Sequence, residues 1–407
     1  MAARGRHAAR VRPDQAEGRR RRGDRRQLHP EDLRRERPHL AGSVIAWVQT
    51  GFGGPEVRRL IEVAAPSPAA DEVVVRVLAV ALNRLDVLQR HEPVVAGMAV
   101  PHVAGMDLVG EVVSAGSAEG EALVGSVVLV DPVVSCGRCE LCLADTPTYC
   151  ARFQTIGSTR DGGMAESVVV PARNCTVVRV APDDTERLTE LAAVPVASVT
   201  AWRGLLSAGR LQAGETVVIP GAGSGLGAAG VQIALRQGAE VFTLVSGERK
   251  RRLAEASGAQ HVIDRTATPD WVAEVQALTD GRGVDLVWDH VGGRFLGQAL
   301  RATRAGGRVV LSGTTDGLDT QLHLPDLYQP GRSIIGHGSY GRADMAAAMA
   351  AFSDGELSVV IDSVWPFDRL PEAEAKLESN DFFGKIVVLG PTVRTEPGAS
   401  DDRKRAA

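Results

Sequence analysis

The sequence predicts an α/β protein in which a β-rich domain is followed by a second domain built on a doubly wound parallel sheet. The first half contains many short Val-rich segments separated by Gly- and Pro-rich turns, a pattern typical of short strands. The second half alternates strand-like and helix-like segments, which is typical of βαβ units. A glycine run, Gly221–Gly227, joins the first of these strands to a helix. The chain of 407 residues is long enough for two hydrophobic cores.

A basic segment precedes the first predicted strand. Residues 1–43 contain thirteen Arg against six acidic residues and little apolar periodicity, so we expect a disordered extension. Three interpretations are a nucleic-acid-binding arm, a targeting peptide and an upstream segment without function. The acidic residues argue against a targeting peptide. The abrupt start of strand-like sequence at Val44 favours the third interpretation.

The composition bounds the partners and the location of the protein. A net charge of −4 gives no indication of nucleic-acid binding, which we therefore consider unlikely. The sequence lacks a run of eighteen uncharged apolar residues, so we expect no membrane span and a cytoplasmic location.

The elements of the β-rich domain follow from alternating or continuous apolar runs between turns. We expect strands at Val44–Gln49, Val73–Ala81, Leu108–Val113, Ser126–Val130 and Met164–Val170.

The elements of the second domain follow from a change of apolar period from two to about 3.6. We expect helices at Ala192–Ala208, from the glycine run to about Gln237, and at Lys250–Ser257, Pro269–Leu278, Phe295–Ala302 and Ala343–Phe352. We expect strands at Glu215–Pro220, Glu240–Val245, His261–Asp264, Val284–Trp288, Gly307–Leu311 and Lys385–Leu389. Residues 391–407 are polar, and we expect them to form a loose tail.

Four of the five cysteines are spaced C-x2-C-x2-C-x7-C, at Cys136, Cys139, Cys142 and Cys150. Four thiolates so close together can surround one tetrahedral Zn²⁺ and leave no open position, which indicates a structural site. Reduced thiols, two disulfides or a site that has lost its metal are the alternatives. The fifth cysteine, Cys175, lies alone in a Val-rich segment and is expected to be a small buried apolar residue.

The glycine run has the context of a dinucleotide site. It follows a buried strand and begins a helix, so a pyrophosphate can approach the backbone N–H groups there. We assign cofactor contacts mainly to Gly225, Leu226 and Gly227, with a simple turn as the alternative. At the end of the next strand stands Ser246, where an NAD site favours an acidic residue. A small residue followed by cations favours NADPH.

The cysteine spacing, with Gly137 in its first gap, resembles the structural-zinc lobe of the medium-chain dehydrogenase/reductase superfamily. The resemblance implies a GroES-like catalytic domain over 44–182, with the zinc lobe at about 132–152, completed by 336–390. It also implies a Rossmann NADP-binding domain over 183–335 and one structural zinc. The family is usually dimeric or tetrameric, so we expect a homodimer or homotetramer that pairs the strand edges of its cofactor domains.

The alcohol dehydrogenase branch of this superfamily holds a second, catalytic zinc through three motifs. Asn83, Met106 and Val196 occupy the ligand places in the corresponding segments of this chain. A carboxamide, a thioether and an isopropyl group are not zinc ligands, so we expect no catalytic zinc.

Several segments instead resemble the zinc-independent quinone oxidoreductases. These are Phe52–Val57, Asn83-x-x-Asp86 with Arg90, Val194–Ala197 with Thr200, and Gly384–Val388. The cysteine lobe departs from the best-known members of that branch. The resemblance places a phosphate-binding lysine at Lys250 and another phosphate contact near Arg265. The alternative is that both residues are solvated cations on the surface.

The resemblance implies an NADPH-dependent reductase that transfers hydride to a quinone or an α,β-unsaturated carbonyl. Asn83 would lie near the nicotinamide, with capping of a strand end as its alternative role, and Thr200 would approach the nicotinamide from its helix. Gly313 and Lys385 are assigned as further cofactor contacts. Asp86 and Arg90 are expected to pair and fix their loop.

Three alternatives remain open. They are an enoyl-thioester reductase, a zinc-dependent alcohol dehydrogenase, and a non-enzymatic NADPH-binding sensor or RNA-binding protein that uses the basic segment. His290 and His337 lie in loops near the expected cofactor edge, but a lone histidine is more often a hydrogen-bonded structural residue. We expect solvent to supply the proton.

Overall fold

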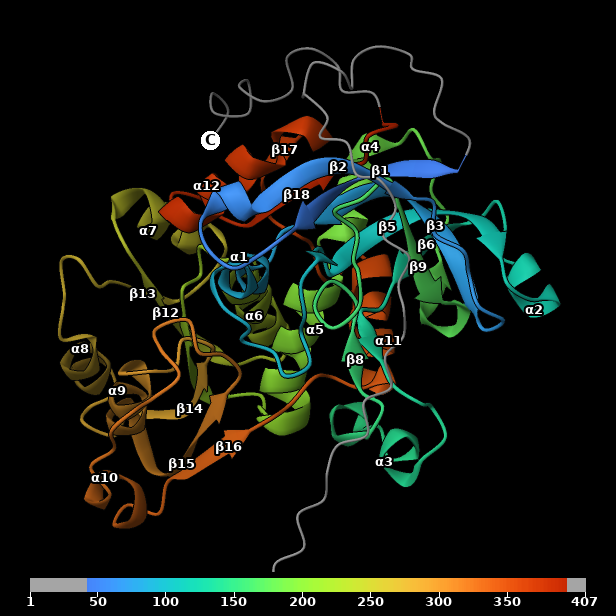
Figure 1. Ribbon diagram of the computed structural model, residues 1–407. Helices are drawn as coiled ribbons and strands as arrows, with labels where there is room; N and C mark the ends of the chain where they lie inside the picture. The colour runs from blue at the N-terminus through green and yellow to red at the C-terminus, as the bar shows by residue number, and fades with distance from the viewer. Residues whose placement is uncertain (1–41, 394–407) are drawn as a thin grey trace, which may run out of the picture.

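The computed structural model describes residues 42–393 and contains two sheet-based domains (Figure 1). The expectations for the basic extension and for most of the tail concern residues outside this range. The β-rich domain contains a seven-stranded sheet and a three-stranded sheet, and a six-stranded sheet forms the second domain.

The β-rich domain encloses its core between its two larger sheets. The three-stranded sheet has the order β2-β1-β4, and the seven-stranded sheet has the order β10-β6-β5-β3-β18-β17 with β9 also on β3. Their strands are β1 (Ser43–Gln49), β2 (Arg58–Ala64), β3 (Glu72–Ala81), β4 (His102–Val103), β5 (Asp107–Ala115), β6 (Val127–Val130), β9 (Ser167–Pro171), β10 (Cys175–Val177), β17 (Ile361–Trp365) and β18 (Lys385–Leu389). The helices are α1 (Arg84–His91), α2 (Ala118–Glu121), α4 (Thr185–Ala192), α11 (Arg342–Ser353) and α12 (Leu370–Ser379).

A small lobe carries the four clustered cysteines. It contains the two-stranded sheet of β7 (Val133–Val134) and β8 (Gln154–Thr155) and the short helix α3 (Glu140–Leu143).

The second domain has six parallel strands in the order β13-β12-β11-β14-β15-β16. This order reverses beside β11, which is the Rossmann arrangement and places a ligand site at the carboxyl ends of the central strands. The strands are β11 (Thr216–Pro220), β12 (Glu240–Val245), β13 (His261–Asp264), β14 (Val284–Asp289), β15 (Thr303–Leu311) and β16 (Ser333–Gly336). The helices are α5 (Pro195–Trp202), α6 (Gly225–Arg236), α7 (Glu248–Ala256), α8 (Trp271–Leu278), α9 (Phe295–Ala302) and α10 (Pro325–Tyr328). The predicted fold class is therefore confirmed.

The helix predicted over Ala192–Ala208 is wrong in its extent. The chain forms α4, which ends at Ala192, and then α5, which continues as a π-helical turn over Arg203–Ala208. Pro195 explains the break, because proline has no backbone N–H and is tolerated only in the first turn of a helix.

The strand predicted at Met164–Val170 also differs, since β9 spans Ser167–Pro171. Before β9 the chain makes a bridge between Ala46 and Ala165 and isolated backbone hydrogen bonds, among them those from the Trp47 N–H to the Met164 carbonyl and from the Glu166 N–H to the Ile45 carbonyl. Its apolar residues are therefore buried without a regular ladder.

The return of the chain into the first domain brings β18 against the glycine run. The Gly384 N–H donates to the Gly223 carbonyl at 2.9 Å, and Ser224 forms a bridge with Gly384. The first residue of β18, Lys385, therefore lies where the two domains meet.

Within residues 42–393, no single helix is both long and apolar enough to cross a membrane. The α4–α5 pair with its π-helical turn meets the length and composition criteria only as a segment bent by 43°.

Candidate active site and zinc centre

The glycine run forms a tight turn ahead of α6. Gly221 has φ +65°, a conformation that favours glycine, and the Ser224 hydroxyl accepts the Gly227 N–H at 3.0 Å as the helix cap. A Cβ on Gly227 would lie 2.1 Å from the Gly221 carbonyl oxygen, so only glycine fits there without a backbone shift. The turn thus exposes the first N–H groups of α6, including that of Leu226, which suits a pyrophosphate.

The residue that follows β12 is Ser246, whose side chain is neutral and exposed. Two acidic residues lie in this region, Glu248 at the start of α7 and Asp264 at the end of β13. The Asp264 carboxylate accepts hydrogen bonds from the N–H groups of Gly247 and Thr266, both at 2.9 Å. These hydrogen bonds lower the pKa of Asp264. Arg265 follows on the surface, so a cation lies beside this loop.

Lys250 lies against the glycine run but turns its ammonium toward the C-terminal segment. Its Cδ would be 3.2 Å from a Cβ on Gly223, and its Nζ donates to the Asn380 carbonyl and lies 5.6 Å from the Phe382 ring centroid. Burial lowers the pKa of Lys250. Its assignment to the 2′-phosphate remains a prediction.

A buried carboxylate, Asp107, connects three separate elements beneath the glycine run. Its Oδ2 accepts from Asn83 Nδ2 at 3.0 Å and from Lys385 Nζ at 2.9 Å, and its Oδ1 accepts from the Val196 N–H at 2.8 Å. Asp107 is fully buried. Thus one carboxylate at the start of β5 fixes the cap residue of α1, the start of α5 and the start of β18.

The Lys385 side chain crosses the glycine run on its way to this carboxylate. A Cβ on Gly225 would lie 2.5 Å from Lys385 Cδ, and the ammonium also donates to Asn83 Oδ1 at 2.8 Å. We assigned Lys385 to the cofactor from sequence. The structure places its stem over the cofactor loop and its charge on Asn83 and Asp107.

The Val196 N–H belongs to the first turn of α5, where helix N–H groups lack internal partners. A carboxylate satisfies that N–H and interacts favourably with the helix dipole. Ala197 on this turn would contact a Cβ on Gly225 at 3.6 Å. Thr200 lies one turn after Val196 in α5, and its approach to the nicotinamide remains a prediction. The other contact predicted from sequence, Gly313, lies two residues after the end of β15, where an added Cβ would be 2.5 Å from the His290 carbonyl oxygen.

The predicted pair of Asp86 with Arg90 is wrong. Arg90 instead binds Glu374 and Glu378 of α12 at 2.8 and 2.7 Å. The Asp86 carboxylate accepts the N–H groups of Asn83 at 2.7 Å and Gly105 at 3.2 Å. Burial raises the pKa of Asp86 to about 6. The chain spacing places Asp86 at the third position of α1, where it forms a capping box instead of facing Arg90.

The two loop histidines are engaged with protein atoms. His290 Nε2 lies 2.7 Å from the Pro220 carbonyl, and burial lowers the pKa of His290 to about 4. His337 Nδ1 lies 2.7 Å from the Gly338 carbonyl, which makes it the donor, so Nε2 accepts from the Ser312 hydroxyl at 2.6 Å. Both rings therefore have the structural role that the sequence favoured.

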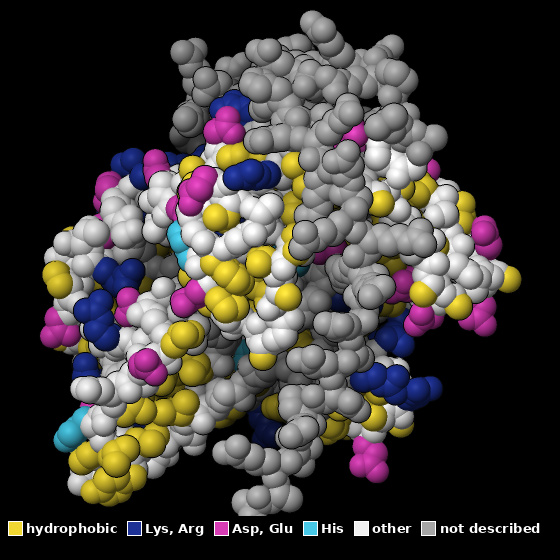
Figure 2. Space-filling view, in the orientation of Figure 1, with side chains coloured by type: hydrophobic (Ala, Val, Ile, Leu, Met, Phe, Trp, Pro, Cys, Tyr) yellow, Lys and Arg dark blue, Asp and Glu magenta, His cyan; other side chains and the backbone are white. Residues whose placement is uncertain are grey.

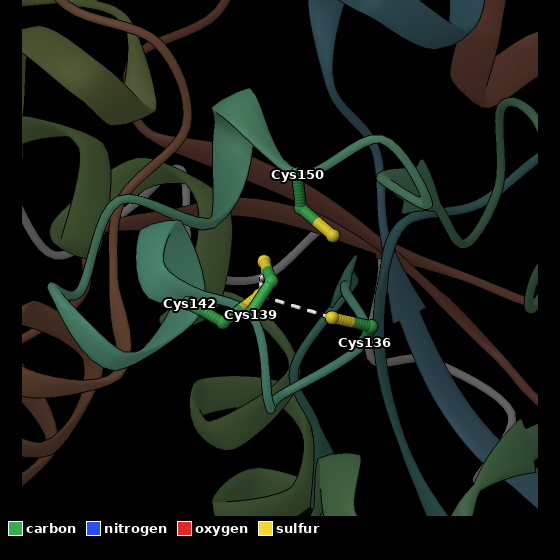
Figure 3. Close-up of side chains that lie close together, drawn as sticks. All are labelled: Cys136, Cys139, Cys142 and Cys150. Carbon is green, nitrogen blue, oxygen red and sulfur yellow. Dashed lines mark hydrogen bonds between the residues drawn. The ribbon is translucent and has the colours of Figure 1, made fainter.

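The four clustered cysteines converge on one point (Figure 3). All four sulfurs lie within 4.8 Å of one another, and the Cys142 sulfur is 3.8 Å from that of Cys136 and 3.5 Å from that of Cys139. A zinc–sulfur distance of about 2.3 Å in a tetrahedron gives sulfur–sulfur distances of about 3.8 Å. Hydrogen bonds from the N–H groups of Arg138 and Cys139 lower the pKa of the Cys136 thiol to about 6. The cluster therefore fits a structural zinc.

The cysteine lobe is docked on the segment that leads from β16 back to the first domain. The Asp145 carboxylate accepts the N–H groups of Arg342 at 2.6 Å and Ala343 at 3.2 Å, and so caps α11 from outside. A Cβ on Gly338 would lie 2.3 Å from the Thr148 hydroxyl. The lobe thus supports the connection between the two domains.

Replacing Cys136 by serine is expected to remove the structural zinc and lower the unfolding temperature by about 5–10 °C, because metal binding contributes to folding. Metal analysis and thermal unfolding would measure both effects. Cys175→Ser is the matched control, since Cys175 lies in β10 outside the cluster. Equal metal content in the two variants would contradict a zinc site at these cysteines.

Comparisons with known proteins agree with this geometry. Residues 69–181 match the model of the alcohol dehydrogenase GroES-like domain, and residues 225–354 match the model of the zinc-binding dehydrogenase. Alcohol dehydrogenase 1 of Emericella nidulans is 30% identical over 352 residues, which cover 85% of this chain and 98% of that protein.

Two further proteins extend the comparison. Acryloyl-coenzyme A reductase of Sulfurisphaera tokodaii is 27% identical over 332 residues, with 81% of this chain and 96% of that protein covered. The crystal structure of an NAD-dependent alcohol dehydrogenase superposes with a TM-score of 0.76 at 33% identity and covers 85% of this chain and 99% of its own.

The fold and the site define an oxidoreductase with a Rossmann domain and a GroES-like domain. The chain belongs to the medium-chain dehydrogenase/reductase superfamily, and its second domain matches the family described as zinc-binding dehydrogenase.

Asp107 is the site residue that sequence reasoning missed. We weighed the Gly105-Met106-Asp107 segment only for a zinc ligand at Met106. The sequence did contain a signal, namely an acidic residue directly before an apolar strand. Such a carboxylate is expected to be buried and therefore to need partners.

Proposed function

We propose that this protein is an NADPH-dependent reductase that transfers hydride to a quinone or an α,β-unsaturated carbonyl without a catalytic zinc. The observation that carries the proposal is the Asn83–Asp107–Lys385 cluster. At the places of the zinc motifs, a carboxamide and an ammonium bind one carboxylate, while Met106 and Val196 offer no ligand atom that zinc prefers.

The dinucleotide, when bound, supplies the hydride and its electron pair. The N–H groups at Gly225 and Leu226 would hold its pyrophosphate, and Gly227 would keep the turn tight enough for that approach. Ser246 and Arg265 would face the adenosine ribose. An exposed serine and a cation accommodate a 2′-phosphate, whereas a carboxylate at the same position would repel it.

A second candidate is reduction of an enoyl thioester. The similarity to acryloyl-coenzyme A reductase over most of both chains favours it. The reaction is chemically related, since hydride adds to the β-carbon of an unsaturated carbonyl in both cases. Zinc-dependent alcohol oxidation is the remaining alternative, given the relatives named alcohol dehydrogenase.

The test is the rate of NADPH oxidation with a small quinone, an enone and an enoyl thioester, beside NADH and with a zinc chelator. We expect NADPH-preferring turnover that survives the chelator, together with one zinc per chain. Two zinc ions per chain and chelator-sensitive alcohol oxidation would contradict the proposal.

Replacing Ser246 by aspartate is expected to weaken NADPH binding about tenfold or more and to improve NADH binding, because the carboxylate repels a 2′-phosphate and accepts hydrogen bonds from a ribose hydroxyl. Fluorescence titration with each cofactor would measure this. Ser246→Asn is the neutral control of the same size. An aspartate variant that binds NADPH as tightly as the asparagine variant would refute the assignment of Ser246.

We further propose a homodimer, or a homotetramer built from it, that pairs the β16 edges of two cofactor domains. β16 is the last strand of its sheet, and Leu318, Leu324 and Tyr328 nearby are 70%, 62% and 67% exposed. Figure 2 shows hydrophobic side chains gathered on this part of the surface, at the lower left. Exposed apolar side chains of this size beside a free strand edge are typical of an interface.

Replacing Tyr328 by aspartate is expected to shift the assembly to monomers, because a charge would have to be buried in the interface. Sedimentation velocity over a range of concentrations would measure the change. Tyr149→Asp provides a control, since Tyr149 is 61% exposed but lies on the cysteine lobe. A Tyr328 variant that sediments like the unchanged protein would place the interface elsewhere.

A further inference from the structure

A glycine-rich segment carries the chain from β16 back into the first domain. Residues 336–341, here called the linker, run from the last residue of β16 to the residue before α11, and three of the six are glycines. Glycine gives a backbone more conformational freedom than any other residue. Contacts with neighbouring elements must therefore supply the rigidity that the sequence of the linker does not.

The cysteine lobe binds the linker where it enters α11. The Asp145 carboxylate accepts the N–H groups of Arg342 and Ala343, which are the first two of that helix. The N-cap residue is Gly341, which has no side chain that could cap the helix itself. A Cβ on Gly341 would lie 2.1 Å from Asp145 Oδ2, so glycine leaves the space that the Asp145 carboxylate fills.

The middle of the linker is held from two sides. On one side is the cysteine lobe, since a Cβ on Gly338 would lie 2.3 Å from the Thr148 hydroxyl oxygen. On the other side, His337 Nε2 accepts the hydroxyl of Ser312, the residue that follows β15. The linker thus lies between the cysteine lobe and the carboxyl ends of β15 and β16, and a Rossmann domain binds its dinucleotide at that edge of the sheet.

The position of Asp145 depends on the loop that carries the cysteines. Its N–H donates to the Cys142 carbonyl at 3.2 Å, and its φ of +56° is in the left-handed region, which is uncommon for a residue other than glycine. Such a conformation persists only where the surrounding structure imposes it. Asp145 lies between Cys142 and Cys150 in sequence, so a zinc held by the four cysteines would close the loop on both sides of it.

α11 connects the lobe to the second domain. The buried Asp344 carboxylate in its first turn binds Arg203 Nη1 at 3.0 Å and accepts the Ser207 hydroxyl. Both partners belong to the π-helical turn that continues α5. Because these side chains are in direct contact, a displacement of α11 would move α5, whose first turn is bound to Asp107 where the two domains meet.

We propose that zinc in the four-cysteine cluster regulates dinucleotide binding through Asp145, which is a positioning residue for the linker and α11. The inference rests on the proposed function only in that the protein binds a nicotinamide dinucleotide. With the metal bound, the lobe holds Asp145 against α11, and the linker keeps one conformation. Without the metal, the linker regains the freedom of its glycines and must be ordered when the dinucleotide binds, which weakens that binding.

The coupling is reciprocal. If zinc raises the affinity for the dinucleotide by some factor, the dinucleotide raises the affinity for zinc by the same factor. This relation gives a readout that does not depend on turnover. A lobe that only contributed stability to its own domain would bind zinc equally well with and without the dinucleotide.

The experiment measures zinc affinity by equilibrium competition with a chromophoric chelator, in the full-length reduced protein, without a dinucleotide and with saturating NADPH or NADH. Asp145→Ala removes the contact with α11. Asp145→Asn is the conservative variant, because asparagine retains an acceptor oxygen and tolerates a left-handed backbone. Glu140→Ala is the matched control, since it removes an exposed acidic side chain from the same lobe. Amide hydrogen exchange over 336–343 reports the order of the linker.

We expect NADPH to tighten zinc binding about tenfold in the unchanged protein and in Glu140→Ala, partly in Asp145→Asn, and not at all in Asp145→Ala. The zinc-loaded Asp145→Ala variant should bind NADPH about tenfold more weakly, as the zinc-free unchanged protein does. Linker exchange should rise in both of these forms. The comparison within the unchanged protein needs no variant, so it stands even if Asp145→Ala does not fold.

Zinc affinity that is indifferent to either dinucleotide in the unchanged protein would overturn the proposal. An Asp145→Ala variant with full coupling, or linker exchange that does not change on zinc removal, would also overturn it. Coupling in a protein that reduces none of the acceptors would support the inference and refute the proposed reductase function. Enone turnover in a protein without coupling would refute the inference alone, and a chain that binds neither dinucleotide would refute both.

Discussion

Replacing Glu374 by alanine is expected to lower the free energy of unfolding by about 3–5 kcal/mol, because it leaves the buried Arg58 guanidinium without its counter-charge and leaves Arg90 with Glu378 alone. Glu374 binds the Arg58 Nε at 3.0 Å and an Arg90 terminal nitrogen at 2.8 Å, and all three side chains are at most 1% exposed. Chemical denaturation followed by circular dichroism would measure the change.

The same helix provides the control for this prediction. Glu372 on α12 pairs with Arg369 at 3.3 Å, but both side chains are about half exposed. Exposed ion pairs contribute about 0–1 kcal/mol, so Glu372→Ala should leave stability nearly unchanged. If both alanine variants lost stability equally, the buried pairing at Glu374 would not be the cause.

Replacing Gly227 by alanine is expected to weaken dinucleotide binding by about 10–100-fold, because the added Cβ would lie 2.1 Å from the Gly221 carbonyl oxygen and displace the turn. That carbonyl also accepts the Ser224 hydroxyl at 2.9 Å, so the helix cap would shift with it. Titration of NADPH fluorescence would measure the affinity, and thermal unfolding would report any loss of fold.

Gly297 in α9 is the matched control, since a Cβ there would meet no atom closer than 3.7 Å. Gly297→Ala should bind the cofactor like the unchanged protein. Normal NADPH affinity in Gly227→Ala would mean that the turn is not the pyrophosphate site.

Features that depend on a contiguous stretch of the sequence were predicted correctly. The cysteine spacing predicted the cluster that the structure forms, since ligands a few residues apart in one loop can converge only locally. The strand predicted at His261–Asp264 and the helix predicted at Phe295–Ala302 have the bounds that the structure gives them. In each case the apolar period and the turn residues of a short segment were sufficient.

The breaks between helices and the ends of strands were predicted less accurately. Pro195 separates α4 from α5, although the apolar pattern continues across it. The strand β15 begins at Thr303, earlier than the predicted Gly307, because it is paired with β14 from Val284 onward despite its two glycines. Pairing with a neighbouring strand overrides the local weakness of glycine in a strand.

The sequence by itself determined the superfamily, the two sheet types, the glycine turn and the cysteine cluster, because each depends on residues close together in the chain. Only the tertiary structure decided that Asp107 joins Asn83, Val196 and Lys385, and that Arg90 pairs with Glu374 in place of Asp86. Arg90 and Glu374 are 284 residues apart, and Asp107 and Lys385 are 278 residues apart. Such partners are selected by the packing of β18 and α12 against the first domain, where each buried charge must find its opposite, and no local pattern records that choice.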